Sequence, residues 1–217
     1  MKKISPSVLD VPKENLIDYI SSLVKWGVSN VHYDVMDGIF VSNQALKLEE
    51  IQKVANQCPK HTMDIHLMVA DPFKYYEIYK NIGDILTFHY EAFKGDELKK
   101  LLSLAEKDGI KMGLAIKPNT DVKEIIPYIS SLSLLLVMSV EPGLGGQKFI
   151  DSSLDKIRAL KEYLDQKNLS NIIIQIDGGV KDINIKSCFD AGVNLAVVGS
   201  YLVKNFAQST IEKLLSE

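Results

Sequence analysis

The sequence predicts a (β/α)8 barrel that occupies residues 1–217 as a single domain. Apolar, β-branched runs recur at intervals of about 25 residues, and amphipathic helical stretches separate them, which implies parallel strands joined by crossover helices. Eight such pairs in 217 residues fit a compact barrel better than a doubly wound sheet. No linker or low-complexity segment interrupts the alternation, so we expect no domain boundary.

The first four strand–helix pairs follow from hydrophobic periodicity. Leu16, Ile20 and Leu23 recur at helical spacing after the first apolar run. Asp71-Pro72 is typical of a helix N-cap followed by proline at the first helical position, and Asp108-Gly109 is typical of a helix C-cap. We expect strands at Ile4–Leu9, Asn30–Met36, Thr62–Val69 and Asp84–Tyr90. We expect helices at Asn15–Lys25, Leu48–Asn56 and Asp96–Lys107, and a further helix that begins after Asp71-Pro72 and includes Phe73, Tyr76 and Ile78.

The second four pairs are bounded by glycine and proline. Ser133–Val140 is almost continuously hydrophobic, as expected of a strand buried on both faces. Gly178-Gly179 and Gly199-Ser200 stop the last two strands. We expect strands at Lys111–Ile116, Ser133–Val140, Asn171–Asp177 and Asn194–Val198, and helices at Val122–Tyr128, Ser153–Asp165, Ile183–Ala191 and around Thr210–Leu215.

The bulk composition excludes several classes of function. The chain is 46% apolar and 24% charged, which is ordinary for a globular protein, and its net charge of −3 includes no basic stripe for nucleic acid. The longest apolar run, Leu132–Val140, is too short to span a bilayer, and no signal-peptide core is visible. Cys58 and Cys188 have no motif spacing, so we expect a reduced cytoplasmic chain without a disulfide.

The stretch from Val31 to Gly38 carries the first chemical signal. Successive side chains of a strand point to opposite faces, so His32, Asp34 and Met36 share one face. Two groups able to bind a metal, two residues apart on a rigid strand, could form half of a metal site; the alternative is a solvated strand face with polar residues by chance.

Polar residues gather where the predicted strands end, the place at which barrel enzymes build their active sites. Three of the four histidines belong to this set, which consists of Ser7, His32, Asp34, His66, His89, Glu91, Lys117, Met138, Glu141, Asp177, Gly199 and Ser200. His32, Asp34, His66 and Asp177 could converge as two imidazoles and two carboxylates, a set that suits Zn, Fe(II), Mn or Co. The structural alternative is a hydrogen-bonded interior His66 and a turn-forming Asp177.

Glycine clusters after three consecutive strands indicate an anion site. They are Gly143-Leu144-Gly145-Gly146, Gly178-Gly179 and Gly199-Ser200. Glycine lets backbone N–H groups approach an anion closely, and barrels often bind phosphate with the loops after the seventh and eighth strands. Plain turn formation is the alternative for each cluster taken alone.

Other residues at the strand ends have less specific interpretations. Met36, Met68 and Met138 are core residues or an apolar wall that keeps water from the reacting carbons. His89 and Glu91 could support a metal ligand from behind or make structural hydrogen bonds, and Asp37 is best explained as a turn residue.

Six segments in chain order resemble the ribulose-phosphate 3-epimerase family. They are Ile4-Ser-Pro-Ser7, His32-Tyr-Asp-Val-Met-Asp-Gly-Ile-Phe-Val41 with Asn43, Asp64-Ile-His-Leu-Met-Val69, Thr87-Phe-His-Tyr-Glu-Ala92, Val137-Met-Ser-Val-Glu-Pro-Gly-Leu-Gly-Gly-Gln147 and Ile176-Asp-Gly-Gly-Val180. The resemblance implies a ribulose-phosphate-binding barrel, an isomerase with one divalent metal ion and no organic cofactor, and a homo-oligomer.

The resemblance also implies roles for individual residues. His32, Asp34, His66 and Asp177 match the metal ligands, and Asp34 and Asp177 match the two acid/base groups. Ser7 and His66 match sugar contacts, and the glycine clusters match the substrate and phosphate loops. The implied reaction interconverts D-ribulose 5-phosphate and D-xylulose 5-phosphate: one carboxylate removes the C3 proton, a metal stabilises the enediolate, and the other acid returns a proton.

The sequence departs from the family pattern around the mouth of the barrel. Ser42 replaces a proline of the family pattern, Leu144 replaces a phenylalanine, and the segment Gln44–Glu49 lacks the usual Gly-Pro pair. Asp10-Val11-Pro12 stands where the family usually has small residues followed by an acid or an amide. A hexulose 6-phosphate, such as D-allulose 6-phosphate, therefore stays open as the substrate.

Two further classes of function are weighed against the epimerase. Related barrel decarboxylases carry Asp-x-Lys-x-x-Asp on a strand, whereas this chain has Asp64-Ile65-His66 there. A Schiff-base lyase would need Lys117, which Pro118-Asn119-Thr120 places in a loop. A non-catalytic phosphosugar-binding barrel would not need the complete set of ligands and acids.

Overall fold

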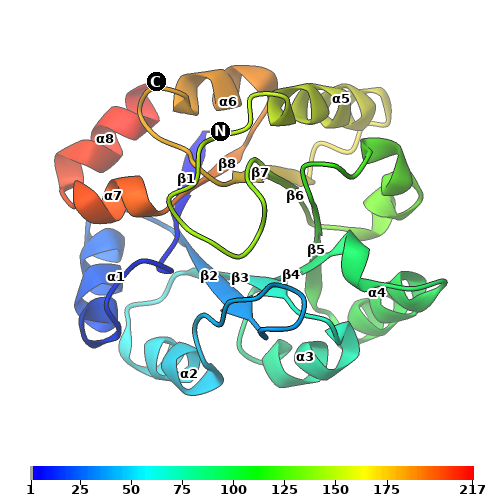
Figure 1. Cartoon of the computed structure of the whole chain (residues 1–217), viewed down its shortest axis with the longest axis horizontal. Helices are drawn as coiled ribbons and strands as arrows, with labels where there is room; N and C mark the ends of the chain where they lie inside the picture. Colours follow the sequence, from blue (N-terminus) through cyan, green and yellow to red (C-terminus); the bar gives the residue numbers. More distant parts are fainter. Residues whose placement is uncertain (1) are drawn as a thin grey trace.

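A computed structural model describes residues 2–217 of the chain and contains eight parallel strands in one sheet. The sheet curls into a nearly closed barrel with the helices outside it (Figure 1), which confirms the predicted (β/α)8 fold. The strands are β1 Lys3–Pro6, β2 Asn30–Met36, β3 Thr62–Met68, β4 Ile85–His89, β5 Lys111–Ile116, β6 Leu134–Met138, β7 Ile173–Asp177 and β8 Leu195–Val198.

The barrel closes at a short seam between β1 and β2. The sheet order runs β1-β8-β7-β6-β5-β4-β3-β2, so these two strands are its edges. A parallel bridge between Ser7 and His32 joins them, and the N–H of Val8 donates to the carbonyl oxygen of His32 at 3.2 Å. The N–H of Ser7 donates to Val198 at 3.1 Å. Ser7 therefore lies between the edge strand β2 and β8.

The helices pack their apolar stripes on the outside of the barrel (Figure 1). In α1, for example, Leu16, Tyr19, Ile20 and Leu23 are buried, at the three- and four-residue spacing of one helix face. The α-helices are α1 Leu16–Lys25, α2 Leu48–Gln57, α3 Pro72–Tyr79, α4 Glu97–Asp108, α5 Ser153–Gln166, α6 Ile185–Ala191, α7 Ser200–Lys204 and α8 Gln208–Ser216.

The predicted helix caps of α3 and α4 are confirmed. The Asp71 carboxylate accepts a hydrogen bond from the Lys74 N–H at 3.1 Å, with Pro72 as the first helical residue. Gly109 ends α4 with a φ of 71°, a left-handed conformation that glycine adopts without strain.

Two helical predictions need correction. The expected helix over Val122–Tyr128 is two 3₁₀ helices, Val122–Glu124 and Ile126–Ser131, because Pro127 has no N–H and its ring obstructs a continuous α-helix. The helix α7 begins at Ser200, where the sequence predicted only the end of a strand. Five residues are too few to show a hydrophobic period.

The structure also bears on two expectations from the composition, which concern membrane-spanning segments and the two cysteines. Between residues 2 and 217, no helix is long and apolar enough to cross a membrane. Cys58 and Cys188 are free thiols, as predicted, and burial raises the pKa of the Cys188 thiol to about 12.

Candidate active site

Four side chains from three strands meet inside the carboxyl end of the barrel. His32 and Asp34 come from β2, His66 from β3 and Asp177 from β7, and one ligand atom of each lies within 4.8 Å of the others. His66 Nδ1 is 3.2 Å from Asp34 and 3.6 Å from Asp177. His32 Nε2 is 3.4 Å from Asp34 and 3.8 Å from Asp177. The structure thus brings together all four predicted metal-binding residues.

Strand register explains why these residues meet. In the parallel pairing of β2 with β3, His32 lies opposite Asp64 and Asp34 lies opposite His66. Alternate residues of each strand point inward, so both facing pairs enter the barrel interior. Asp177 is the last residue of β7 and pairs with Met138 of β6, which places its carboxylate at the same end of the barrel.

Burial and charge act in opposite directions on the groups of this cluster. Both His32 and His66 are fully buried, whereas the Asp177 side chain is 17% exposed. Burial alone lowers the pKa of His32, but the carboxylates of Asp64 and Asp34 outweigh it and raise that pKa well above its usual value. Burial alone raises the pKa of Asp34, yet the neighbouring imidazoles hold it below its usual range.

The two imidazoles turn different nitrogens toward the carboxylates. His32 Nδ1 is 2.8 Å from Asp64 Oδ2, which also accepts a hydrogen bond from the Gln175 amide. His32 Nε2 has no hydrogen-bond partner among the described residues and faces Asp34 and Asp177. A buried, unpartnered imidazole nitrogen beside two carboxylates fits a divalent cation, and Zn, Fe(II), Mn or Co suits this donor set.

His66 shows the reverse arrangement. Its Nδ1 faces the carboxylates, while its Nε2 lies 2.9 Å from Nε2 of His89. His89 Nδ1 is in turn 3.2 Å from the Glu91 carboxylate. Burial, opposed by the hydrogen bond to Glu91, lowers the pKa of His89 to about 4. His89 and Glu91 therefore lie behind the cluster of His32, Asp34, His66 and Asp177 and form hydrogen bonds there.

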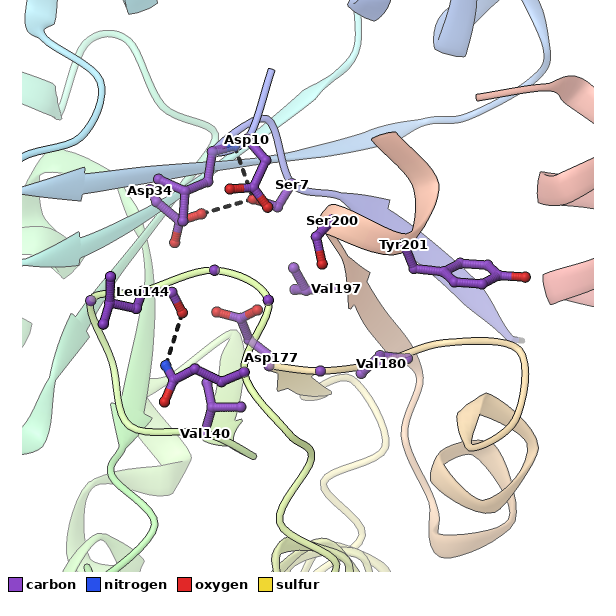
Figure 2. A pocket seen from close by; sticks show the side chains of 18 of the residues that line it. Ser7, Asp10, Asp34, Val140, Leu144, Asp177, Val180, Val197, Ser200 and Tyr201 are labelled. Atoms are coloured by element: carbon purple, nitrogen blue, oxygen red, sulfur yellow. Dashed lines mark hydrogen bonds between the residues drawn. The ribbon is translucent and has the colours of Figure 1, made fainter. Parts of the chain in front are cut away.

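A cavity of about 210 Å³ opens above the cluster (Figure 2). The carboxylates of Asp34 and Asp177 point into it, whereas the two histidines lie beneath its surface. Its lining includes the residues predicted to form the apolar wall and the glycine loops, together with Ser7: Ser7, Met36, Met68, Met138, Gly143, Leu144, Gly145, Gly146, Gly178, Gly179, Gly199 and Ser200. Residues 193 positions apart in the chain thus border one space, since Ser7 and Ser200 both line it.

Two of the glycines are required by close approach of the backbone. Gly178 has a φ of 119°, and a Cβ there would lie 2.4 Å from the Val140 side chain. Gly179 has a φ of 66°, and a Cβ there would lie 2.8 Å from the backbone at Gln147 and Phe149. The loop between β6 and α5 therefore packs directly on the end of β7, and it crosses the mouth of the barrel in Figure 1.

Other residues from the sequence analysis lie away from the cavity lining. Lys117 follows β5 in a loop, and its Nζ lies 4.2 Å from the centre of the Phe40 ring. Asp37 is a turn residue, as predicted: its carboxylate accepts from the N–H groups of Ile39, Phe40 and Ala70 at 2.7–2.8 Å. Glu141 is exposed.

Sequence reasoning missed several residues that line the cavity. Asp10 approaches Gly145 so closely that a Cβ there would lie 2.8 Å from its carboxylate. Lys181 and Lys204 supply two cations to the lining. Lys181 follows Gly178-Gly179-Val180 and could have been found from that spacing, whereas Lys204 reaches the cavity only because of α7.

The fold and the site define a (β/α)8 barrel that holds a two-histidine, two-aspartate cluster under a glycine-rimmed cavity. The sequence model of the Ribulose-phosphate 3 epimerase family matches residues 3–203. The chain belongs to the ribulose-phosphate 3-epimerase family, whose members are isomerases that act as epimerases.

Curated relatives agree with this assignment, and a solved structure shares the fold. Ribulose-phosphate 3-epimerase of Bacillus subtilis is 36% identical over 221 aligned positions, which cover 100% of this chain and 98% of the relative. The cytoplasmic isoform from Oryza sativa is 36% identical over 91% of this chain and 86% of its own length. A mutant tryptophan synthase alpha-subunit from Pyrococcus furiosus (TM-score 0.72, 16% identity, 99% and 98% coverage) shares the fold.

Proposed function

We propose that the chain catalyses metal-dependent 3-epimerisation of a ketose phosphate, interconverting D-ribulose 5-phosphate and D-xylulose 5-phosphate. One observation carries the proposal: the ligand atoms of His32, Asp34, His66 and Asp177 lie within 4.8 Å of one another, and the two carboxylates border the cavity. His32 through Nε2, His66 through Nδ1 and the two aspartates would hold one divalent ion. When bound, this ion supplies Lewis-acid stabilisation of the negative charge that develops on the substrate.

Asp34 and Asp177 are the proposed acid/base pair. They come from different strands and point toward one another in Figure 2, so a sugar between them meets a carboxylate on each side. One carboxylate removes the proton from C3, and the other, as the carboxylic acid, delivers a proton to the opposite face. The direction of the reaction decides which of the two is protonated at the start.

The rest of the lining positions the substrate. Met36, Met68 and Met138 offer an apolar surface without hydrogen-bonding groups, which keeps water from the carbanion-like carbons. Gly143–Gly146, Gly178-Gly179 and Gly199-Ser200 are the proposed phosphate loops, and Lys181 and Lys204 add positive charge beside them. Ser7, which lines the cavity, is a proposed sugar contact, whereas His66, also expected to contact the sugar, is fully buried beneath the lining and stays a proposed metal ligand. Binding energy from the phosphate end can then orient C3 between the carboxylates.

A coupled assay with D-ribulose 5-phosphate, run with and without a chelator, tests the proposal. We expect conversion to D-xylulose 5-phosphate that is lost on chelation and restored by Zn, Fe(II), Mn or Co. Activity that survives exhaustive metal removal would contradict the metal role. Turnover of D-allulose 6-phosphate in place of the pentulose would assign the substrate to the hexulose class, and the altered Ser42–Glu49 segment would then be the first region to exchange.

The expectations of a single domain over 1–217, a cytoplasmic location and a homo-oligomer belong to the same proposal. The free thiols of Cys58 and Cys188 are compatible with a reducing compartment. Limited proteolysis, cell fractionation and light scattering test the three expectations separately.

A further inference from the structure

A chain of buried hydrogen bonds runs from the cluster toward the loop after β5. His66 Nε2 lies 2.9 Å from His89 Nε2, and His89 Nδ1 lies 3.2 Å from Glu91 Oε2. The other oxygen of Glu91 accepts from the Lys117 N–H at 2.7 Å and from the Thr120 hydroxyl. These hydrogen bonds thus connect β3, the end of β4 and the loop after β5.

Only one direction of donation is consistent with this chain of hydrogen bonds when Glu91 is ionised and His89 is neutral. A carboxylate only accepts hydrogen bonds, so Nδ1 of His89 must donate to Glu91. A neutral His89 then presents an unprotonated Nε2, which must accept from His66. His66 therefore carries its proton on Nε2, and Nδ1 keeps a free lone pair when the imidazole is neutral. That nitrogen is the one that faces Asp34 and Asp177.

We propose that Glu91 is a positioning residue that acts through His89 to hold the proton of His66 on Nε2 and leave Nδ1 ready to bind the metal. The inference rests on the proposed metal site. Each of the two proposed histidine ligands then has a carboxylate that fixes the position of its ring proton. Asp64 contacts His32 directly, whereas Glu91 acts on His66 through the imidazole of His89.

The packing around this chain is suited to fixing its orientation. His89 is fully buried, with its ring centre 4.9 Å from Phe40 and 5.0 Å from His66. On the far side, the Lys156 ammonium donates to the carbonyl groups of Lys117 and Pro118 at 3.1 and 2.6 Å, which anchors the β5 loop to α5. Glu91 therefore contacts a loop that is itself held in place.

Glu91→Gln is the diagnostic variant because it keeps the shape but leaves one acceptor oxygen. If that oxygen accepts from the fixed Lys117 N–H, the amide NH₂ faces Nδ1 of His89 and demands an acceptor there. His89 must then carry its proton on Nε2, opposite the N–H of His66. Thr120→Val is the matched control, since it removes a loop contact of Glu91 and leaves the His89 contact intact.

Imidazole ¹⁵N NMR tests the direction of donation directly. The chain has only four histidines, so His89 signals can be assigned by their loss in His89→Asn. In the metal-free wild-type protein at pH 7.5, we expect His89 to be protonated at Nδ1 alone, and Thr120→Val to behave identically. In Glu91→Gln we expect the proton on Nε2. A wild-type His89 protonated on Nε2 would overturn the proposal.

Zn²⁺ affinity, measured by competition with a chromophoric chelator, tests the consequence. We expect Glu91→Gln to weaken Zn²⁺ binding about tenfold, and Thr120→Val to leave it within about twofold. Equal weakening by both variants would assign the effect to the β5 loop and overturn the positioning role. A wild-type protein that binds no Zn²⁺ would overturn the proposed metal site. The NMR measurement on the metal-free protein would still decide, independently, whether His89 accepts the proton of His66.

Discussion

The hydroxyl of Ser7 donates a 2.9 Å hydrogen bond to Oδ2 of Asp34, within the buried seam where the barrel closes (Figure 2). The same Ser7 bridges to His32 through its backbone. One residue thus joins the two edge strands and orients a carboxylate that the proposed mechanism requires. Both residues line the cavity, so this hydrogen bond lies at its wall (Figure 2).

Ser7→Ala should lower both stability and turnover. The substitution leaves Oδ2 of a buried carboxylate without its donor, a loss of about 1–3 kcal/mol in the free energy of unfolding. Ser5→Ala is the matched control, because Ser5 is also buried, in β1 two residues before Ser7, but its hydroxyl has no partner among the described residues. The free energy of unfolding in urea and kcat/KM should both fall for Ser7→Ala and stay unchanged for Ser5→Ala. Equal losses in the two variants would contradict the role of the hydrogen bond.

Asp177→Asn should reduce kcat by about a thousandfold without unfolding the protein, because an amide cannot exchange a proton with C3. The Asp177 side chain is partly exposed, and among residues 2–217 its carboxylate approaches only the imidazoles of His32 and His66, at 3.8 and 3.6 Å. Asp84→Asn provides the comparison: Asp84 accepts from the Met63 N–H at the opposite end of the barrel, so stability should fall while kcat stays within about twofold. Turnover by Asp177→Asn near the wild-type rate would eliminate the two-acid assignment.

Removal of the metal should lower thermal stability as well as activity. A ligand at about a hundred times its Kd stabilises the folded state by about 2.7 kcal/mol, or about 5–10 °C in Tm for a chain of this size. His66→Gln should abolish the chelator-dependent shift in Tm. His61→Gln should retain it, since His61 bonds the Tyr33 hydroxyl and the Pro59 carbonyl, away from the cluster.

Much of this arrangement could be predicted from the sequence, for identifiable reasons. The bounds of β2 were predicted without error, because alternation of polar and apolar residues and the Asp37-Gly38 turn define a strand locally. The glycine clusters were found because each follows a strand end. The contact of His66 with His89 was not predictable, since it depends on the register of β3 with β4, where His66 pairs with Thr87. Lys204 was missed because α7 is too short to have a hydrophobic pattern.

Gly179→Ala should be far more damaging than a glycine substitution of similar φ elsewhere. At Gly179 a Cβ would lie 2.8 Å from backbone atoms of the β6–α5 loop, which cannot move aside as a flexible side chain would. Gly95 has a φ of 53° and nothing within 4 Å of a Cβ, so Gly95→Ala should destabilise by only about 1 kcal/mol. For Gly179→Ala we expect chemical denaturation to show a loss of about 3 kcal/mol in the free energy of unfolding, and we expect a raised KM for the sugar phosphate. Equal losses of stability in Gly179→Ala and Gly95→Ala would show that the β6–α5 loop moves to accommodate the added Cβ.

The stability that Glu91 contributes should disappear in acid. Burial raises the pKa of its carboxyl, but hydrogen bonds from His89, Thr120 and the Lys117 N–H lower it to about 2, against about 4.3 in the unfolded chain. A depressed folded-state pKa gives stability that is complete above the unfolded pKa and is lost as pH falls toward the folded pKa. The contribution, about 3 kcal/mol at pH 7, should fall by about a third at pH 3.5 and by about half near pH 3, and it should vanish below about pH 2. The difference in unfolding free energy between the wild-type protein and Glu91→Gln should therefore narrow from pH 5.5 to 3.5. A difference that is constant over this range would show that the Glu91 charge does not contribute to folding stability.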